Sequence, residues 1–293
     1  MKTPWEFLQY SRNKIKNTWK IAFVSAFVIG LLIHLPVMLS DIPNHDGLSS
    51  MYFDQNMITS GRWFLTVACG FSSYFTIPWV IGLIGMVWLS LASVVLTETM
   101  ELEDPLTIIG VSGLLVSFPA LASTFAYVFT MDGYMMALFL AVLSVLFTQK
   151  YKKGWILGGV CLAFSMGIYQ AYLPFAILLC VYVILLFFME EHGVKEKVQY
   201  TLRYLGMGIA GAVLYYVILQ ILLKLQGKVL DTYQGINSME QGGSGQGMLT
   251  TLKGMYYDFL AFTLHGDVLV NNIFSFAACA VLMLSVVFLL VRR

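Results

Sequence analysis

Two carboxylates are the side chains of this sequence best suited to acid–base chemistry, because both lie beside long apolar stretches. Asp46 follows the first such stretch by a few residues, and Asp132 precedes another. A carboxylate at the edge of an apolar region is costly to desolvate, so it indicates a functional or a local structural role. Asp46 is interpreted either as a general base or metal ligand, or as part of a helix start, in which Asn44 or Asp46 is the N-cap for Leu48 onward. For Asp132 the N-cap is the stronger interpretation, because Asp before an apolar run is a typical helix start.

One arginine is placed to bind an anion. Arg62, in a Ser-Gly-Arg-Trp sequence, is the only lysine or arginine between residues 41 and 77. Its guanidinium can hold a phosphate through a planar fork of donors, or it can lie at a membrane interface beside Trp63. Tyr169 and Gln170 interrupt a later apolar stretch, where polar residues face a cavity or a partner helix. Ordinary helix packing is the simpler explanation for that pair.

The composition is that of a membrane protein. Of the 293 residues, 59% are hydrophobic and 11% are charged, and the mean hydropathy is +0.79. A soluble domain carries about 25% charged residues, so this chain exposes apolar surface that only a lipid bilayer accommodates. The net charge of +1 indicates no nucleic-acid partner. The sequence contains no Walker motif, so nucleotide-driven transport by this chain alone is not expected.

The apolar stretches predict an all-α bundle of about eight transmembrane helices. A crossing helix needs about 20 apolar residues, and a break around residues 167–174 divides one overlong stretch into two helices. The expected spans are Ile21–Ser40, Pro78–Thr97, Leu106–Leu121, Gly133–Phe147, Trp155–Ser165, Tyr172–Met189, Tyr204–Leu223 and Ile273–Val291.

The basic residues predict the orientation of this bundle. With both termini in the cytoplasm, thirteen of the 17 lysines and arginines fall on the inner side and four on the outer side, as the positive-inside rule requires. The turn at residues 98–104 is then internal although it carries no basic residue. The long segments 41–77 and 224–272 are external loops, which places the expected function on the outer face. Within the second, residues 249–263 are expected to form an amphipathic helix at the membrane interface.

Four short motifs, in this order and spacing, resemble the bacterial glucosyltransferase family that decorates O-antigen and other surface polysaccharides. The resemblance covers most of residues 20–190, and family members are often longer, so it leaves open whether residues 1–293 are the whole transmembrane domain. The motifs are Asn44-His45-Asp46-Gly47, Ser60-Gly61-Arg62-Trp63, Asp132-Gly133-Tyr134 and Ile168-Tyr169-Gln170-Ala171-Tyr172.

The resemblance implies a GT-C-like membrane enzyme that takes a sugar from a polyprenyl-phosphate carrier on the outer face. It implies that Asp46 is the catalytic base, Arg62 a phosphate contact, and Asp132 a second carboxylate for the acceptor or a divalent metal. Tyr169 and Gln170 would line the sugar pocket. His45 stands where the family often has a second acid, and it is grouped with the substrate-binding residues.

The expected function is therefore transfer of glucose or a similar hexose to an extracytoplasmic surface glycan, by a multi-pass protein of the plasma membrane. One alternative is a transporter or flippase for lipid-linked sugars, and another is a non-catalytic membrane subunit. A transporter places polar residues at mid-membrane and often has two related halves, whereas the charges here gather at the outer edge. The charge distribution favours the enzyme.

Overall fold

The computed structural model describes residues 14–40, 46–50, 54–70, 72–75, 77–231 and 248–260, with Thr3 and six single positions between 277 and 288. The chain divides into two compact units, Met1–Ile236 and Asn237–Arg293. Within the described residues the secondary structure is helical, apart from one isolated bridge between Met57 and Arg62. The all-α prediction is thus confirmed for the part of the chain that the structure describes.

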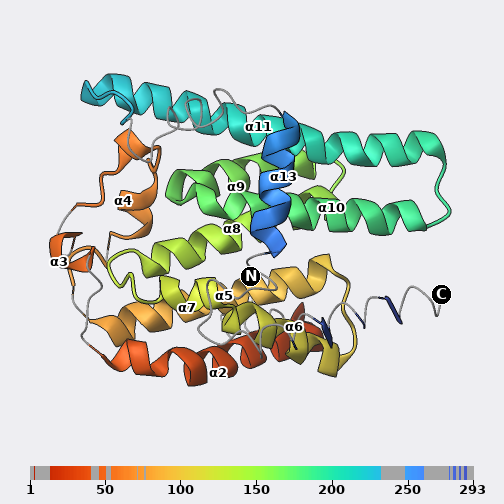
Figure 1. Ribbon diagram of the computed structural model, residues 1–293, viewed down its shortest axis with the longest axis horizontal. Helices are drawn as coiled ribbons and strands as arrows, with labels where there is room; N and C mark the ends of the chain where they lie inside the picture. Colours follow the sequence, from red (N-terminus) through yellow and green to blue (C-terminus); the bar gives the residue numbers. More distant parts are fainter. Residues whose placement is uncertain are drawn as a thin grey trace. The chain divides into compact units, whose positions relative to one another are not determined.

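The first unit is built from long apolar helices joined by short ones (Figure 1). Within the part of the chain that the structure describes, five segments are long and apolar enough to cross a membrane, which supports a membrane protein. They are α2 (Asn17–Leu39), α5 (Pro78–Thr99), α8 (Met131–Lys150), the segment Gln170–Met189 that contains η2 (Gln170–Tyr172) and α10 (Leu173–Met189), and α11 (Val194–Gln226). The shorter helices are α3 (Gly47–Ser50), η1 (Ile58–Ser60), α4 (Leu65–Ala68), α6 (Pro105–Ser117), α7 (Pro119–Thr124) and α9 (Gly154–Ile168).

Seven of the eight expected spans coincide with these helices, but a count of eight is not confirmed. Two of the seven, α6 and α9, have only 13 and 15 residues. The eighth, Ile273–Val291, lies outside the described residues except for single positions. The predicted end of the third span was wrong, because its helix breaks at Phe118. Pro119 disfavours helical dihedrals at the preceding residue, and Phe118 has φ −61° and ψ 130°.

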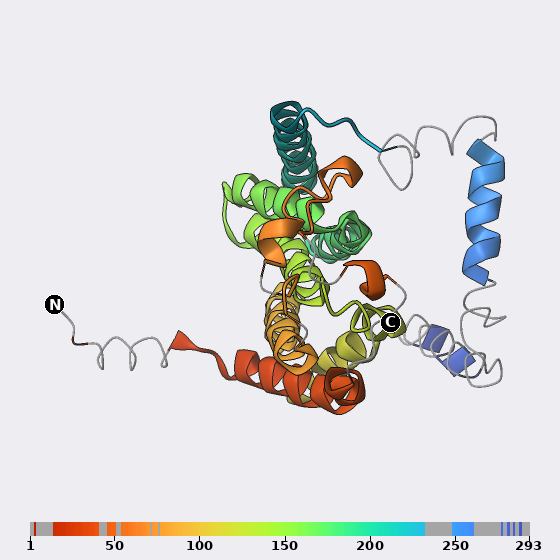
Figure 2. The same cartoon turned by 90° about the vertical axis from the view of Figure 1, so that its left-hand side faces the viewer.

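Five of the described helices form a row in which each packs on the next. In Figure 1, α2 packs on α5, α5 on α8, α8 on α9 and α9 on α11, with α6 beside α2. Small residues allow the close contacts: a Cβ on Gly159 would lie 3.2 Å from the Gly211 backbone nitrogen. His34, within α2, is 1% exposed, and its Nε2 lies 2.9 Å from the Val116 carbonyl oxygen. Figure 2 shows these helices nearly end-on, from the side where α3 and α4 lie.

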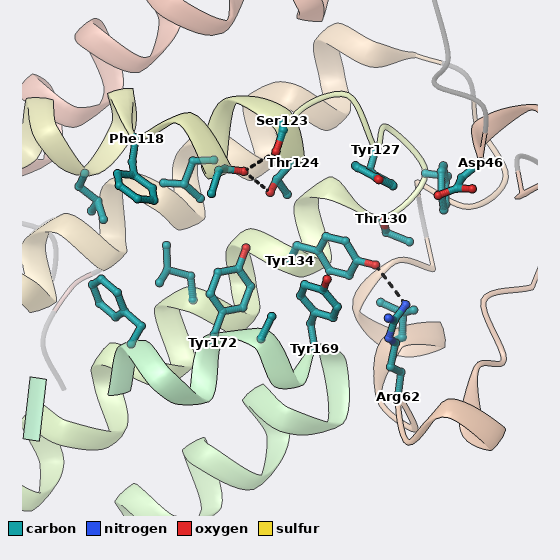
Figure 3. Close-up of a pocket in the computed structure, with 18 of the residues that line it drawn as sticks. Asp46, Arg62, Phe118, Ser123, Thr124, Tyr127, Thr130, Tyr134, Tyr169 and Tyr172 are labelled. Atoms are coloured by element: carbon teal, nitrogen blue, oxygen red, sulfur yellow. Dashed lines mark hydrogen bonds between the residues drawn. The ribbon is translucent and has the colours of Figure 1, made fainter. Parts of the chain in front are cut away.

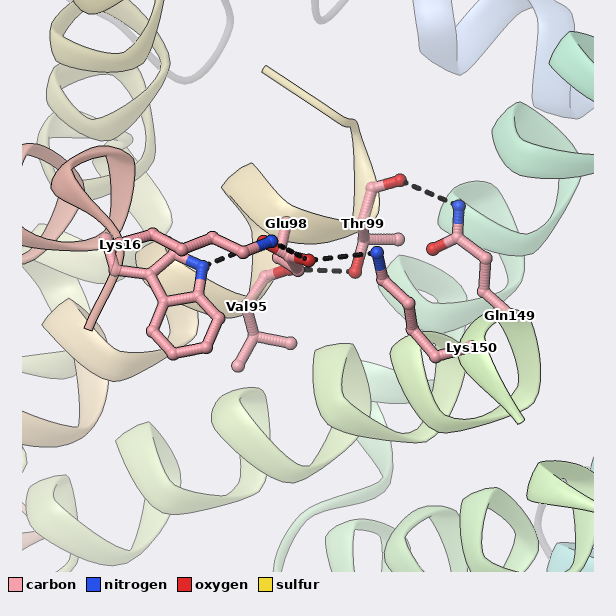
Figure 4. Close-up of polar contacts among 7 residues, drawn as sticks. Lys16, Val95, Glu98, Thr99, Gln149 and Lys150 are labelled. Carbon is pink, nitrogen blue, oxygen red and sulfur yellow. Dashed lines mark hydrogen bonds and ion pairs between the residues drawn. The ribbon is translucent and has the colours of Figure 1, made fainter. Parts of the chain in front are cut away.

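Three helix ends meet at Glu98, at the opposite end of the bundle. Lys16, one residue before α2, and Lys150, the last residue of α8, form ion pairs with Glu98 at 2.7 and 2.9 Å (Figure 4). Trp19 Nε1 also donates to this carboxylate, at 2.8 Å. The turn at residues 98–104 therefore lies beside two lysines, although it carries no basic residue itself.

The second unit contains one described helix, α13 (Met248–Leu260). It confirms the helix expected within residues 249–263. The described side chains at residues 252–258 are all exposed. Its position at a membrane interface stays a prediction.

Candidate functional site

A cavity of about 1000 Å³ lies in the first unit, between the loop that carries Arg62, the α6–α7 break and the start of α10. This volume is that of a site for a sizeable small molecule, since such pockets span about 300–1,000 Å³. Figure 3 shows Asp46 and Arg62 at one end of the cavity and Phe118 at the other. Side chains with hydroxyl groups lie between these ends: Ser123, Thr124, Tyr127, Thr130, Tyr134, Tyr169 and Tyr172.

The half of the lining that α6 and α10 provide is apolar. Helix α6 contributes one face of side chains at positions near helical spacing, and Phe118 continues this surface at the break. From the other side, α10 adds Phe175, the third residue of that helix. The cavity is therefore amphipathic along its length, with charged groups at one end. The apolar lining residues of α6 are Val111, Leu114 and Leu115.

Arg62 is held by two aromatic rings. Its Cζ lies 4.8 Å from the ring centroid of Tyr169, and its Nη1 donates a long hydrogen bond of 3.5 Å to the Tyr134 hydroxyl (Figure 3). The two rings are stacked on each other, with centroids 4.4 Å apart. Its Nε is buried without a hydrogen-bond partner among the described residues. The rings orient the guanidinium, and unlike a carboxylate partner they do not neutralise its charge.

The loop around Arg62 is a tight reversal whose sequence explains its shape. The Arg62 N–H donates to the Met57 carbonyl at 3.0 Å, and Gly61 between them has φ 78°, a left-handed conformation suited to glycine. The next residue, Trp63, packs against Gly167 at the end of α9. A Cβ on Gly167 would lie 2.6 Å from the indole ring, so only glycine allows this approach. The loop is thereby fastened to α9.

Asp46 lies on the cavity wall at the polar end, as Figure 3 shows. It is partly exposed and directly precedes α3 (Gly47–Ser50). Its backbone carbonyl accepts hydrogen bonds from the N–H and the hydroxyl of Ser49, each at 3.2 Å. The predicted helix start after Asp46 is thus confirmed, and the carboxylate shares the cavity with Arg62. His45 lies outside the described residues.

Asp132 does not line the cavity. It is 4% exposed, and its carboxylate accepts hydrogen bonds from the Ser72 hydroxyl at 2.7 Å and from the Gly133 N–H at 2.9 Å. The N-cap interpretation was wrong in position, because Thr130 is the N-cap of α8 and Asp132 lies in the first turn. A carboxylate in the first turn is stabilised by the helix dipole. The structure therefore does not bring Asp132 together with Asp46 and Arg62.

Tyr169 and Gln170, adjacent in sequence, point to different surroundings. Tyr169 lines the cavity, whereas Gln170 is not among the lining residues. Gln170 Nε2 instead donates to the Ser60 carbonyl at 3.2 Å and to the Tyr215 hydroxyl at 3.0 Å. Sequence reasoning missed Tyr134 and Tyr215 as neighbours of the Arg62 loop. Tyr134 lies within the Asp132-Gly133-Tyr134 motif, and its hydroxyl in that motif is the signal that could have identified it.

A divalent metal in the cavity would need a group of His, Cys, Asp or Glu side chains as ligands among the described residues that line it. Among the described residues there is no group of three or more His, Cys, Asp or Glu side chains that could hold a metal ion. Asp46 is the one carboxylate among the described residues that line the cavity. No ligand set for the divalent metal considered above is therefore identified in the part of the chain that the structure describes.

Comparison with known proteins gives one family. The family model described as Glucosyl transferase GtrII matches residues 35–293. This range contains all the lining residues of the cavity. Neither a curated protein nor a solved structure matches the chain.

Proposed function

Because this chain belongs to the Glucosyl transferase GtrII family, we propose that its cavity is the active site of a membrane glucosyltransferase that uses a polyprenyl-phosphate sugar. The sugar transferred is glucose or a similar hexose. The acceptor is a surface glycan, such as O-antigen, on the outer side of the plasma membrane.

The amphipathic lining of the cavity is the observation that carries the proposal for the donor. A polyprenyl-phosphate sugar has an anionic phosphate between a polar sugar and a long hydrocarbon chain. The cavity offers a cation, Arg62, near one end and apolar side chains such as Phe118 and Phe175 toward the other. A soluble nucleotide sugar is polar along its whole length, so its polar groups would lack hydrogen-bond partners in the apolar half of the cavity.

The chemistry follows from which groups share the polar end. In a direct displacement, an acceptor hydroxyl oxygen attacks the sugar C1 while the bond from C1 to the phosphate oxygen breaks. The electron pair leaves with the polyprenyl phosphate, and the hydroxyl proton passes to the Asp46 carboxylate. The guanidinium of Arg62 stabilises the negative charge that develops on the phosphate. Both side chains line the cavity at the same end.

The remaining candidate residues support these two groups in the proposal. Tyr169 lies under the guanidinium and faces the cavity, so it both orients Arg62 and forms a wall for the sugar. Asp132 lies behind the wall, and we assign it to holding Ser72 against the start of α8. That start also carries Tyr134, which contacts Arg62. In the proposal, His45, which precedes Asp46 in the sequence, also contacts the substrate.

The orientation belongs to the same proposal. The Glu98 cluster and the α10–α11 turn lie at one end of the bundle, and the loop with Arg62 lies at the other (Figure 1). The basic residues assign the first end to the cytoplasm. The polar end of the cavity then faces outward, where lipid-linked sugars meet surface glycans, and both chain termini are cytoplasmic.

Transfer by the purified protein is the test. The wild type and Arg62→Ala are reconstituted in nanodiscs with radiolabelled polyprenyl-phosphate glucose and isolated surface polysaccharide. The proposal predicts labelled polysaccharide with the wild type and a large loss with Arg62→Ala. In proteoliposomes, movement of the lipid-linked sugar across the bilayer without any labelled glycan would instead identify the transporter of the alternative hypothesis.

A further inference from the structure

Two side chains outside the cavity hold the backbone just before Arg62. Gln170 Nε2 donates to the Ser60 carbonyl and to the Tyr215 hydroxyl, and Tyr215 in turn donates to the Gly61 carbonyl at 3.0 Å. Tyr215 is 7% exposed, on the face of α11 that packs against the loop. Both N–H groups of the amide and the hydroxyl proton therefore have acceptors. The two carbonyls they hold belong to the residues immediately preceding the arginine.

The hydrogen bond from Tyr215 holds the loop at Gly61, the position where its backbone can most easily change conformation. Gly61 is in the left-handed conformation, with φ 78°, and glycine has more backbone freedom than any other residue. A rotation there would move the Arg62 guanidinium off the Tyr169 ring. With its carbonyl bound by Tyr215, Gly61 is held in the left-handed conformation in which the arginine lies over that ring.

The backbone conformation at Tyr169 explains why Tyr169 and Gln170, adjacent in sequence, contact different parts of the loop that carries Arg62. Tyr169 is extended, with φ −156° and ψ 115°. Successive side chains of an extended segment point in opposite directions. Tyr169 therefore faces the cavity and meets the guanidinium, and Gln170 faces the loop and meets its backbone.

We propose that Gln170 and Tyr215 are positioning residues that set the direction of the Arg62 guanidinium, and that neither contacts the sugar. The effect on catalysis rests on the function proposed above. The effect on the loop does not, because it concerns only the backbone of residues 57–64. The two parts can be measured separately.

Hydrogen exchange tests the loop itself. Tyr215→Phe removes the hydroxyl and keeps the ring, and Tyr216→Phe is the matched control because Tyr216 is 54% exposed. In nanodiscs, amide exchange within residues 57–64 should be about tenfold faster in Tyr215→Phe, the scale of one or two lost hydrogen bonds. Exchange in α5 and α8 should stay unchanged, as should all exchange in the control. Equal loop exchange in both variants would overturn the proposal.

A double-mutant cycle with Arg62 tests the role in transfer. Alone, Tyr215→Phe and Gln170→Leu should each lower kcat/KM for the lipid-linked donor by about tenfold. Combined with Arg62→Ala, neither should cause a further loss, because both act through the arginine. Full additional losses in that background would mean that these residues contact substrate directly, and would overturn the positioning role. Faster loop exchange in a protein that transfers no sugar would reject the proposed function and, with it, any role of these residues in catalysis.

Discussion

Lys150, the last residue of α8, forms an ion pair of 2.9 Å with Glu98 near the end of α5. These two residues are far apart in the sequence, yet they join helix ends on the same side of the bundle. Glu98 also binds Lys16 at the start of α2, so one carboxylate connects three helices. The contact matters for topology because it ties an acidic turn to the basic residues that predict the cytoplasmic side.

The first prediction concerns that topology. Single cysteines introduced at Glu103 and Lys153 should react with a membrane-impermeant reagent only after the cytoplasmic side is opened, because the Glu98–Lys150 pair places both turns on one side. A cysteine within residues 242–247 should react in intact cells. Labelling of Glu103→Cys in intact cells would reject the proposed alternation of helices.

The second prediction concerns the stability that this ion cluster provides. Glu98→Gln keeps the shape and one acceptor for Trp19 but loses two ion pairs, so the free energy of unfolding should fall by roughly 1–2 kcal/mol, between the values for exposed and buried pairs. Glu103→Gln is the control, because this exposed residue lies in the same turn. The thermal midpoints in detergent should separate the two variants. Identical midpoints would show that the cluster does not stabilise the bundle.

The third prediction concerns the phosphate contact. Arg62→Ala should lower kcat/KM for the lipid-linked donor by about 10- to 100-fold, the effect of losing charge-assisted hydrogen bonds. Arg62→Lys should recover only part of the loss, since an ammonium lacks the planar fork and stacks less well on Tyr169. Lys228→Ala, at an exposed position, should behave as the wild type. Unchanged donor kinetics in Arg62→Ala would return this residue to the role of an interfacial anchor.

The fourth prediction concerns the base. Asp46→Asn keeps the size of the side chain and removes the proton acceptor, so kcat should fall by about 10²-fold or more while the protein folds normally. Asp132→Asn should lower stability more than Asp46→Asn does, because Asp132 is buried and bonded to Ser72. Transfer rates and thermal midpoints of both variants give the comparison. Near-normal transfer by Asp46→Asn with an inactive but folded Asp132→Asn would reverse the assignment.

The fifth prediction concerns the ring beneath the guanidinium. Tyr169→Phe should keep most of the transfer activity, because a phenyl ring still supports Arg62 through its π face. Tyr169→Ala should raise KM for the donor several-fold, since it removes both the support and part of the cavity wall. Equal KM values in the two variants would show that the ring face contributes nothing to donor binding.

Much of the fold could be predicted from the sequence because apolar stretches record where lipid or core surrounds a helix. Helix α11 extends farther than predicted, from Val194 to Gln226. Its first turns carry charged residues such as Lys195 and Lys197, which a hydropathy argument excludes from a span although they are good helix formers. The break before Pro119 could have been predicted, since proline restricts the residue before it.

The candidate site was predictable only where one short motif supplies a residue. Asp46, Arg62 and Tyr169 were identified from their types and neighbours, and the structure places all three on one cavity. Tyr215 could not be identified, because nothing in its own stretch of α11 shows that its hydroxyl reaches Gly61, 154 positions earlier. Gln170 was identified, but its direction depends on the extended backbone of Tyr169.

The shortness of α9 has a consequence for how phosphate binding at Arg62 depends on salt concentration. Its 15 residues reach about 22 Å, against about 30 Å for the hydrocarbon core of a bilayer. In the proposed orientation, α9 starts at the inner boundary and therefore ends several ångströms below the outer one, where Tyr169 meets Arg62. Mobile ions screen charges in water over about 8 Å at physiological ionic strength, but they screen partly buried charges much less, and Arg62 is partly buried. The attraction between the Arg62 guanidinium and a lipid phosphate should accordingly persist at high salt concentration. Arginines on the surfaces of soluble proteins bind phosphate more weakly under the same conditions.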